Sequence, residues 1–391
     1  MKNKQPPPVK TGNRSVKETD IFFRQNWVEI DKSDFLFNLK KIKEYIAKDT
    51  KIMAVLKANA YSHGGIILAK EAQRVGISNI AVATLEEGIQ FREAGIKANI
   101  LILGTIYPCE NFQVALAHSL TPTISNMQDI LALESLTVKL NKKINFHLKV
   151  DTGMGRIGAL PEATYVLLNK ISKIPQLNMI GIYTHFPVAD TDSDFTKLQL
   201  DTFSKVVRYA RQDLGLKFIA HAANSAALFK NKRTHFDMVR PGISLYGLNP
   251  FKHSESVLKL KPVLSWKTRI IFLKKVPSGF SVSYGRTFVT NKVSVLATIP
   301  VGYADGYSRL LSNKSDVLVR GKRCPVIGRI TMDMTMVDVT GIKGVSLGDE
   351  VVLIGLQGKE QIKVDELAKI QETINYEVVC SISSRVPRVI V

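Results

Sequence analysis

Cysteine and long apolar runs are both scarce in this chain of 391 residues. The three cysteines, Cys109, Cys324 and Cys380, are odd in number, far apart and without a CxxC pair, which excludes a disulfide framework and suits a reducing compartment. No apolar run reaches the roughly 20 residues that a helix needs to span a bilayer. The N-terminal segment MKNKQPPPVKTGNRS has neither the apolar stretch nor the cleavage site of a secretory signal. We therefore expect a cytoplasmic protein with no membrane partner.

Acidic residues are also few, because 34 of them stand against 54 basic residues and leave a formal net charge of +20. Residues 1–26 contain six basic and two acidic residues, so they contribute only +4 of this excess. A nucleic-acid partner would account for such a charge. The basic residues are scattered, however, and match no RNP-like, zinc-finger or basic-zipper pattern. We expect no nucleic-acid function, since a solvated basic surface that helps to attract an anionic cofactor explains the same charge.

A polar segment precedes the periodic part of the chain. Residues 1–26 contain prolines and lack periodicity, which predicts a flexible tail. Residues 27–31 predict a short leading strand, which we expect to join the C-terminal domain. A helix should follow, because apolar residues recur at helical spacing as far as Ile46, with Ser33 or Asp34 as the N-cap.

From Lys51 onward, short apolar runs alternate with amphipathic segments. The runs are KIMAVL, NIAVAT, ILILGT, LTPTIS, INFHLKV, MIGIYTHF, KFIAHAA and FDMVRPGI. Strands that alternate with helices form a parallel sheet through right-handed crossovers. Eight such units over roughly 200 residues fit a TIM-type (β/α)₈ barrel better than an open doubly wound sheet. We predict an α/β fold with this barrel over residues 27–260.

The pattern changes after Pro262 to short β-like runs separated by Gly, Asp, Asn and Ser. The runs are LSWKTRIIFLKKV, SVLATIPV, DVLVRG, CPVIGRI, TMVDVT and DEVVLIG. Only VDELAKIQ has helical character. We predict a mainly antiparallel β-domain over residues 261–391.

Lys57 lies where an active-site residue of such a barrel is expected, at the C-terminal end of the first barrel strand. A lysine that closes an apolar strand is commonly a solvated end residue. Here, however, Tyr61 and His63 follow in the same loop, and Gly64-Gly65 allows close approach of a backbone. A partly desolvated lysine in such a site can form a Schiff base with an aldehyde cofactor.

The segment AVLKANAYSHG resembles the lysine signature of the alanine racemases, a fold-type III family that depends on pyridoxal 5′-phosphate (PLP). Further motifs of that family follow in order: DTGMGRIG at 151–158, YTHF at 183–186, HAANSAA at 221–227, VRPGISLYG at 239–247, SYGRTF at 283–288, GYADGY at 302–307, GRITMDM at 328–334 and INYEV at 374–378. The ordered series is specific, and the resemblance covers residues 27–391. One difference is Ser62, where the family usually has Gly, and it concerns the local loop conformation.

Two bases are implied by the resemblance. Lys57 carries PLP and serves one face of the substrate Cα, and Tyr284 serves the opposite face, as deprotonation on one side and reprotonation on the other require. Because the unperturbed pKa of tyrosine is near 10, neighbouring groups must favour its phenolate. His185 resembles the family's imidazole linked to that tyrosine. Taken without the resemblance, Tyr284 would be a packed tyrosine of the β-domain.

Arg240 matches the family's arginine that faces the pyridine nitrogen of PLP. A permanent cation there disfavours protonation of that nitrogen and makes the ring a weaker electron sink, which suits racemisation better than transamination. Asn224 precedes the segment SAALF, a helix start where backbone N–H groups favour an anion. The residues that match the family's phosphate contacts are Tyr61, Ser225, Gly242, Ile243 and Tyr376.

Substrate contacts are also implied by the resemblance. Arg156 matches the residue that binds the substrate carboxylate, for which a planar guanidinium is well suited. Lys149 matches a lysine that is often carbamylated in the family, where the added negative charge orients the arginine. The implied assembly is a homodimer with composite active sites and no metal. Its partner subunit would contribute Tyr303, Met332, Asp333 and the base Tyr284.

The resemblance implies an enzyme that interconverts L- and D-alanine and supplies D-alanine for peptidoglycan. Racemisation of serine or of a broad range of amino acids stays open. A non-catalytic PLP-binding protein of the single-barrel kind is another class, but it would lack the β-domain. A decarboxylase on the related barrel is disfavoured because it would offer a carboxylate where Arg240 stands, and because its Gly-rich phosphate loop is missing.

Overall fold

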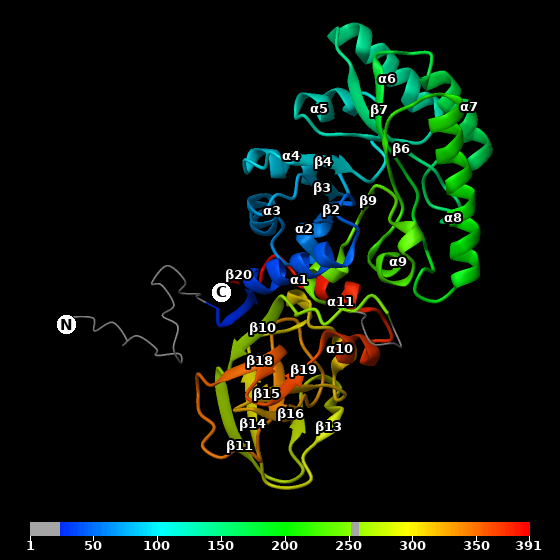
Figure 1. Ribbon diagram of the computed structural model, residues 1–391. Coiled ribbons are helices and arrows are strands. Elements are labelled where there is room, and N and C mark those ends of the chain that lie inside the picture. The colour runs from blue at the N-terminus through cyan, green and yellow to red at the C-terminus, as the bar shows by residue number, and fades with distance from the viewer. Residues whose placement is uncertain (1–23, 252–257) are drawn as a thin grey trace, which may run out of the picture. The chain divides into compact units, whose positions relative to one another are not determined.

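The computed structural model describes residues 24–251 and 258–391, and these form two compact units (Figure 1). The unit that we call the barrel unit comprises Ile30–Ser265, Lys363–Ser383 and Ile390–Val391. Of the described residues, the β-unit comprises Trp266–Ile362, Ser384–Val389 and 24–29. Of the predicted flexible tail, residues 1–23 lie outside the described residues.

An eight-stranded parallel sheet forms the core of the barrel unit, in the order β4-β3-β2-β9-β8-β7-β6-β5. The strands are β2 (Lys51–Val55), β3 (Asn79–Val82), β4 (Asn99–Ile102), β5 (Thr123–Ile124), β6 (Ile144–Lys149), β7 (Leu177–Tyr183), β8 (Ile219–His221) and β9 (Met238–Val239). A parallel bridge between Leu101 and Thr121 connects the two ends of this order, so the sheet is nearly closed. Each of the eight predicted runs overlaps one of these strands, and the predicted barrel is confirmed.

Helices alternate with these strands along the chain (Figure 1). They are α1 (Lys32–Tyr45), α2 (Lys57–Tyr61), α3 (Gly65–Arg74), α4 (Leu85–Glu93), α5 (Asn111–Ala117), α6 (Met127–Leu140), α7 (Pro161–Ile171), α8 (Ser193–Arg208) and α9 (Ser225–Lys230). In α8, Thr196, Leu200, Phe203 and Val207 are buried at helical spacing, so one face of the helix packs on the core. Every described helix falls short of what crossing a bilayer would require.

Two details of the barrel unit differ from the predictions. The N-cap of α1 is Asp31 and not Ser33 or Asp34, because the Asp31 carboxylate accepts hydrogen bonds from both of those backbone N–H groups. The second difference is the position of α10 (Val364–Ile370) and α11 (Asn375–Cys380), which follow the β-rich region in sequence but belong to the barrel unit.

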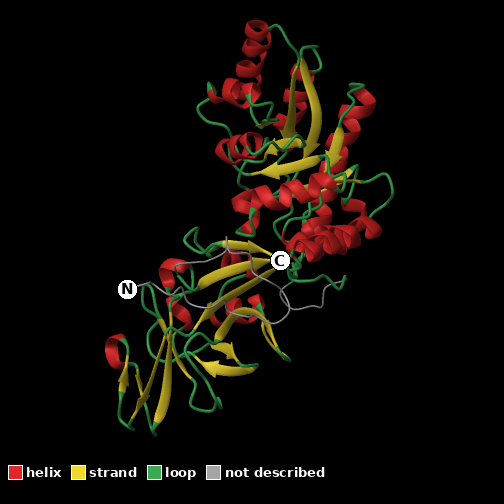
Figure 2. Cartoon of the chain, turned by 90° about the vertical axis from the view of Figure 1, so that its left-hand side faces the viewer, coloured by secondary structure: helices red, strands yellow, loops and turns green. Residues whose placement is uncertain are grey.

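Strands, drawn in yellow in Figure 2, dominate the second part of the structure. It is built around a seven-stranded sheet in the order β16-β15-β18-β10-β1-β20, with β19 paired to β18. Its strands are β1 (Asn26–Ile30), β10 (Leu264–Arg269), β15 (Asp316–Val319), β16 (Lys322–Pro325), β18 (Glu350–Gln357), β19 (Glu360–Ile362) and β20 (Arg388–Ile390). The smaller sheets contain β11 (Phe272–Val276), β14 (Ser294–Ile299) and β17 (Thr335–Asp338), and β12 (Ser281–Val282) with β13 (Phe288–Val289). The predicted antiparallel domain is therefore confirmed.

Two predicted runs of this region differ in the structure. LSWKTRIIFLKKV forms two strands, β10 and β11, and not one. CPVIGRI forms a strand only at its first residues, because Gly328 has a φ of +71° and its position leaves no room for a side chain. A Cβ atom there would lie 2.8 Å from the Val282 carbonyl oxygen.

Arg24, Gln25 and Asn26 were predicted to be part of the flexible tail, but they are anchored in the structure. The Arg24 guanidinium pairs with the fully buried Asp305 carboxylate. Thr268 donates a hydrogen bond of 2.5 Å from its hydroxyl to the Gln25 carbonyl oxygen. Strand β1 therefore starts at Asn26, one residue before the predicted start.

Candidate active site

A cavity of about 190 Å³ opens at the C-terminal ends of the barrel strands, where active sites of such barrels lie. Its lining brings together eleven of the predicted site residues: Lys57, Tyr61, Lys149, Arg156, His185, Asn224, Ser225, Arg240, Gly242, Ile243 and Tyr376. Val55, Leu103 and Tyr183 also line it and were not predicted. All of these residues belong to the barrel unit.

Lys57 lies two residues after β2, and its amine faces the cavity. Burial first, and the nearby Arg156 second, lower its pKa below the ordinary lysine value, while Glu87 opposes them. A larger fraction of the amine is then unprotonated and nucleophilic at neutral pH. The backbone that follows is unusual, because all five residues from Ala58 to Ser62 have φ between 51° and 64°.

The buried Arg240 lines the cavity, and its guanidinium donates hydrogen bonds to three neighbouring groups. One guanidinium nitrogen donates to the carbonyl oxygens of Thr184 at 2.6 Å and Ala222 at 2.9 Å. The other donates to Nδ1 of His221 at 2.9 Å. Burial lowers the pKa of Arg240 to about 10, so the group stays a cation at neutral pH.

Two buried histidines extend this set and were missed by the sequence reasoning. Burial and then Arg240 hold the pKa of His221 well below its ordinary value, so the neutral ring accepts from Arg240 at Nδ1 and donates from Nε2 to Nδ1 of His147 at 2.9 Å. Gly181 makes room, because a Cβ atom there would lie 2.3 Å from the His147 ring. The signal was present, since His221 opens the HAANSAA motif and His147 lies in an apolar strand.

Lys149 and Tyr183 form the inner wall of the cavity. Burial, followed by Arg156 and Arg240, lowers the pKa of Lys149 to about 7. The Lys149 amine lies 5.4 Å from the centre of the Tyr183 ring, and the Arg240 guanidinium carbon lies 5.2 Å from it. The two cations therefore face one aromatic ring, a favourable arrangement for groups with little solvent.

Arg156 is presented by a loop that Asp151 organises. Although burial opposes it, hydrogen bonds from backbone N–H groups lower the pKa of the Asp151 carboxyl. The donors are Gly153, Met154, Gly155 and Arg156, at 2.7 to 3.2 Å. The DTGMGRIG motif is thus a carboxylate-centred loop, which places the exposed Arg156 side chain at the cavity.

Hydroxyl and backbone amide groups form another part of the cavity lining. Ser225 accepts a hydrogen bond of 2.9 Å from the backbone N–H of Gly242 and shares one of 3.0 Å with the Ser244 hydroxyl. A Cβ atom at Gly242 would lie 2.8 Å from the Tyr61 hydroxyl oxygen, so a side chain here would displace the Tyr61 phenol. Burial raises the pKa of Tyr61 and of Tyr376, and both phenols therefore stay protonated donors.

The other four predicted residues lie in the β-unit and do not line this cavity in the described chain. Tyr284 is 73% exposed, Met332 53% and Tyr303 43%. The backbone N–H groups of Tyr303 and Ala304 donate to the carbonyl oxygens of Thr331 and Met332. These hydrogen bonds join the loop of Tyr303 to the loop of Met332. Asp333 accepts a hydrogen bond of 2.8 Å from Arg385. The predicted link between His185 and Tyr284 stays a prediction.

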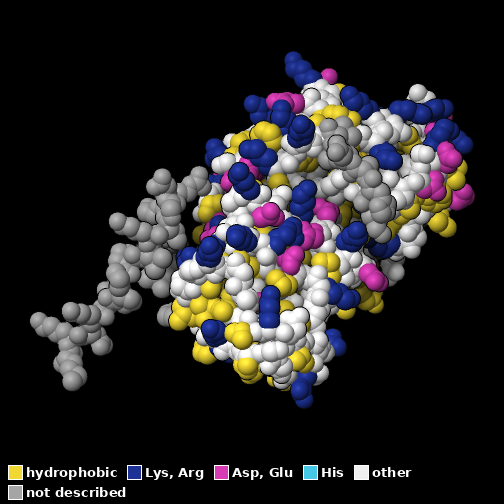
Figure 3. Space-filling view, turned by 90° about the horizontal axis from the view of Figure 1, so that it is seen from below, with side chains coloured by type: hydrophobic (Ala, Val, Ile, Leu, Met, Phe, Trp, Pro, Cys, Tyr) yellow, Lys and Arg dark blue, Asp and Glu magenta, His cyan; other side chains and the backbone are white. Residues whose placement is uncertain are grey.

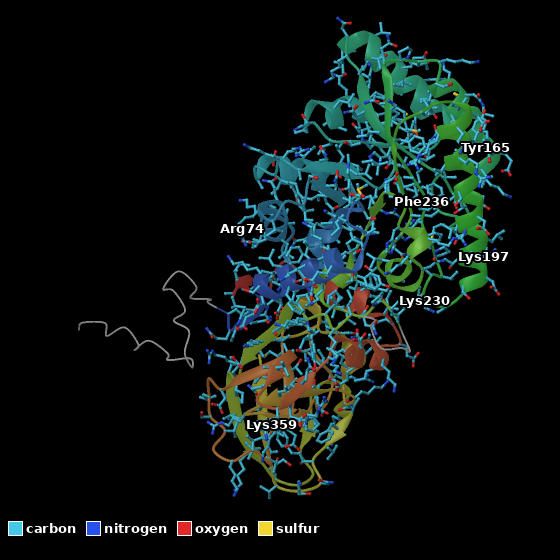
Figure 4. The ribbon with its side chains drawn as sticks, in the orientation of Figure 1. Arg74, Tyr165, Lys197, Lys230, Phe236 and Lys359 are labelled. Atoms are coloured by element: carbon cyan, nitrogen blue, oxygen red, sulfur yellow. The ribbon has the colours of Figure 1, made fainter. Side chains whose placement is uncertain are left out.

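Basic side chains do not gather into one patch on the face of the molecule seen in Figure 3. Lys and Arg side chains lie there among acidic and uncharged ones. In the barrel unit, Arg74, Lys197 and Lys230 project from three different helices, α3, α8 and α9 (Figure 4). Within the described part of the chain, no group of three or more His, Cys, Asp or Glu residues is placed to hold a metal ion.

Known proteins resemble this chain over nearly its whole length. The family models "Alanine racemase, N-terminal domain" and "Alanine racemase, C-terminal domain" match residues 30–250 and 263–390. An alanine racemase of Halothermothrix orenii is 46% identical over 369 residues, which are 93% of this chain and 96% of the relative. One of Carboxydothermus hydrogenoformans is 43% identical over 94% of this chain and 100% of its own length.

Solved structures agree with these relatives. The alanine racemase of E. faecalis superposes with a TM-score of 0.89 at 35% identity, over 94% of this chain and 98% of its own. The alanine racemase of Bartonella henselae, whose structure is described with covalently bound pyridoxal phosphate, has a TM-score of 0.84 at 30% identity. It covers 94% of this chain and 99% of its own.

Proposed function

The chain belongs to the alanine racemase family, whose members are isomerases, and from that premise we propose that its barrel cavity binds PLP through Lys57 and racemises alanine. One observation carries the proposal: a partly buried lysine, a buried arginine and a cluster of hydroxyl groups converge on one cavity. The runner-up substrates are serine and a broader set of amino acids. We also propose a cytoplasmic location and a role in supplying D-alanine for peptidoglycan.

The residues present fit PLP at three points. Lys57 offers a primary amine whose lowered pKa suits attachment to an aldehyde. Ser225, Tyr61 and Tyr376, with the backbone of Gly242 and Ile243 and with Asn224 at the start of α9, supply uncharged polar groups for a phosphate. Arg240 offers a fixed cation for the pyridine nitrogen. When bound, PLP withdraws electrons from the substrate Cα and acidifies its C–H bond.

Lys57 then acts on one face of the substrate Cα, where its amine takes the proton from one alanine enantiomer and, in the reverse direction, returns a proton to the deprotonated Cα on that face to form the same enantiomer. Arg156 orients the substrate through its carboxylate with a planar guanidinium. Lys149, with a pKa of about 7, has enough neutral amine for carbamylation, and we propose that the resulting anion orients Arg156.

Arg240 keeps its proton at neutral pH because its pKa is about 10, and it donates hydrogen bonds to two carbonyl oxygens and to His221. These partners fix the plane of its guanidinium. We propose that it faces the pyridine nitrogen as a permanent cation and thereby limits transamination. His185, whose neutral imidazole is favoured by burial and by Arg240, lines the same cavity as a hydrogen-bonding group.

Tyr284, Tyr303, Met332 and Asp333 lie outside this cavity, and we propose that they complete the site of a second subunit. Their exposure supports this, because a tyrosine at 73% exposure and a methionine at 53% are available to another chain. A two-fold axis would create two identical composite sites. In each, Tyr284 of one chain serves the Cα face opposite Lys57 of the other.

Identifying the lysine that carries the cofactor tests whether the cavity binds PLP through Lys57. Borohydride reduction of the enzyme with PLP, followed by peptide mapping, should place the pyridoxyl label on Lys57. A racemisation assay over a panel of L-amino acids should show alanine as the preferred substrate and a dependence on PLP. A label on another lysine would contradict the proposal for Lys57, and preference for serine would favour the runner-up.

Mixing variants tests the composite site. Lys57→Ala and Tyr284→Phe chains should each be severely impaired, but each heterodimer would contain one site with both intact bases. Recovery towards half of the wild-type activity per heterodimer is the expected result. Heterodimers that form without any recovery would place both bases on one chain and contradict the dimer proposal.

A further inference from the structure

The turn after Lys57 has a backbone that does not form on its own. Ala58, Asn59, Ala60, Tyr61 and Ser62 form a run of left-handed residues, none of which is glycine. Left-handed turns of such residues crowd Cβ against the following carbonyl oxygen. A run of this kind persists only where surrounding contacts over-determine it.

Glu87, in the first turn of α4, makes the contact nearest to Lys57. Its Oε1 accepts a hydrogen bond of 2.5 Å from the backbone N–H of Ala58, the residue that follows the lysine. Its Oε2 accepts one of 2.7 Å from the backbone N–H of Ala83, after β3. Thr84 caps α4 by accepting from the Glu87 backbone N–H at 3.3 Å. One carboxylate thus ties the start of the turn to the neighbouring strand.

The far end of the turn has its own contacts. Asn59 accepts a hydrogen bond of 2.6 Å from the backbone N–H of Gly65 through its side-chain oxygen. Ser62, the position where the resemblance expected glycine, donates from its hydroxyl towards the carbonyl oxygens of Cys380 and Ile382, each at 3.2 Å. The far end is therefore held by several groups, whereas Glu87 supplies the side-chain contact at the end beside Lys57.

We propose that Glu87 is a positioning residue, which holds the left-handed turn at its first peptide and so directs the Lys57 side chain into the cavity. The proposal rests on the assignment of PLP to Lys57. Glu87 does not line the cavity, so it acts through the backbone. Its negative charge also opposes the effects of burial and of Arg156 on the pKa of Lys57, and the test must separate charge from geometry.

Two substitutions at one position make that separation. Glu87→Gln removes the charge and keeps the length, but the amide has one acceptor for two N–H donors. Glu87→Asp keeps the charge and shortens the side chain, so its carboxylate no longer spans both N–H groups. Glu86→Gln is the matched control, because Glu86 lies in the same first turn, is exposed and makes no contact with Ala58 among the described hydrogen bonds.

The measurements are the equilibrium Kd of PLP for each apoenzyme, kcat and KM for L-alanine at saturating PLP, and the Tm of the apoenzyme. We expect both Glu87 variants to raise the Kd of PLP by about 10- to 100-fold, as loss of hydrogen bonds to a charged group implies. Their kcat should fall by up to about 100-fold because the lysine is misplaced, while KM changes less. Glu86→Gln should stay within about two-fold of the wild type.

Three outcomes would overturn the inference. A wild-type Kd and kcat in both Glu87 variants would show that the turn does not need the carboxylate. If Glu87→Asp has the wild-type Kd and kcat while Glu87→Gln does not, the charge of Glu87 matters and the length of its side chain does not. A fall in apoenzyme Tm with an unchanged Kd in the variants would assign Glu87 a purely structural role. If Glu87→Gln fails to fold, Glu87→Asp decides alone. A borohydride label away from Lys57 in the wild-type enzyme would instead refute the proposed function.

Discussion

The predicted site residues of the barrel unit and those of the β-unit are held in different ways. Arg240 and Lys149 are each only 3% exposed, and Arg240 is fixed by hydrogen bonds within its own unit. Tyr284 and Met332 stand at 73% and 53% exposure. The barrel unit therefore has a cavity lined by buried polar groups among apolar ones, whereas the β-unit presents its four predicted site residues to solvent. In the proposed function this difference separates two tasks, since the barrel cavity would hold the cofactor and the exposed surface of the β-unit would supply the second base.

Removing the proposed base of each unit should cause the largest loss of activity and should separate the two units most clearly by their effect on PLP binding. Lys57→Ala should abolish retention of PLP and lower kcat by more than about 10³-fold, because the same amine anchors the cofactor and moves the proton. Tyr284→Phe should lower kcat by about 10²- to 10⁴-fold and leave the Kd of PLP unchanged. Titration of PLP into the apoenzymes and a racemisation assay measure both. Loss of PLP binding in Tyr284→Phe would break the division of tasks.

Reversing one charge in each unit should give the next largest effect, on the free energy of unfolding and on the ratio of transamination to racemisation. Arg240→Glu would place a buried carboxylate against the carbonyl oxygens of Thr184 and Ala222, and should lower the free energy of unfolding by about 3–5 kcal/mol. It should also raise transamination relative to racemisation, because the permanent cation is lost. Lys359→Glu, on the exposed surface of the β-unit (Figure 4), should stay within about 0.5 kcal/mol. An unchanged ratio of D-alanine to pyruvate in Arg240→Glu would contradict this role.

The buried Lys149 makes stability depend on pH. Its pKa of about 7 in the folded chain lies below the value of about 10.4 expected when unfolded. Between these two values the unfolded chain binds one more proton, so the cost of burying the amine is complete below pH 7 and is relieved as the pH rises towards 10. The free energy of unfolding should therefore gain up to about 1.4 kcal/mol per pH unit from this group.

Denaturant titrations between pH 7 and 10, without added bicarbonate, measure that slope. Lys149→Met should lower the slope of stability against pH by the amount that one proton contributes, about 1.4 kcal/mol per pH unit. Lys359→Met, at the exposed β-unit position, should leave this slope unchanged. The same slope in wild type and Lys149→Met would show that Lys149 does not titrate in this range.

An anchor of the β-unit should have the smallest effect. Arg24→Ala removes the bidentate partner of the buried Asp305 and should cost about 1–2 kcal/mol of stability, without changing the Kd of PLP. Lys41→Ala, which removes an exposed pair with Glu44 in the barrel unit, is the control and should cost no more than about 0.5 kcal/mol. Equal costs for the two variants would show that burial of Asp305 does not matter.

Much of the fold could be predicted because its signals are local. Each barrel strand is an apolar run flanked by an amphipathic segment, and these runs coincide with β2 to β9. Lys57 was identified because it closes one of these runs at the end where barrel active sites lie. The helix α10 was predicted from VDELAKIQ. The helix α11 was missed, because its six residues contain too few turns to show a period.

Sequence alone thus determined the class of each element, the order of the motifs and the side chains with chemical capacity, because periodicity and residue type are properties of neighbours in the chain. Only the tertiary structure decided that His221 and His147 join Arg240, that Tyr183 faces two cations, and that Glu87 reaches the peptide after Lys57. Glu87 and Ala58 are 29 residues apart. Their contact depends on how two adjacent strands are registered in the barrel, which no local pattern specifies.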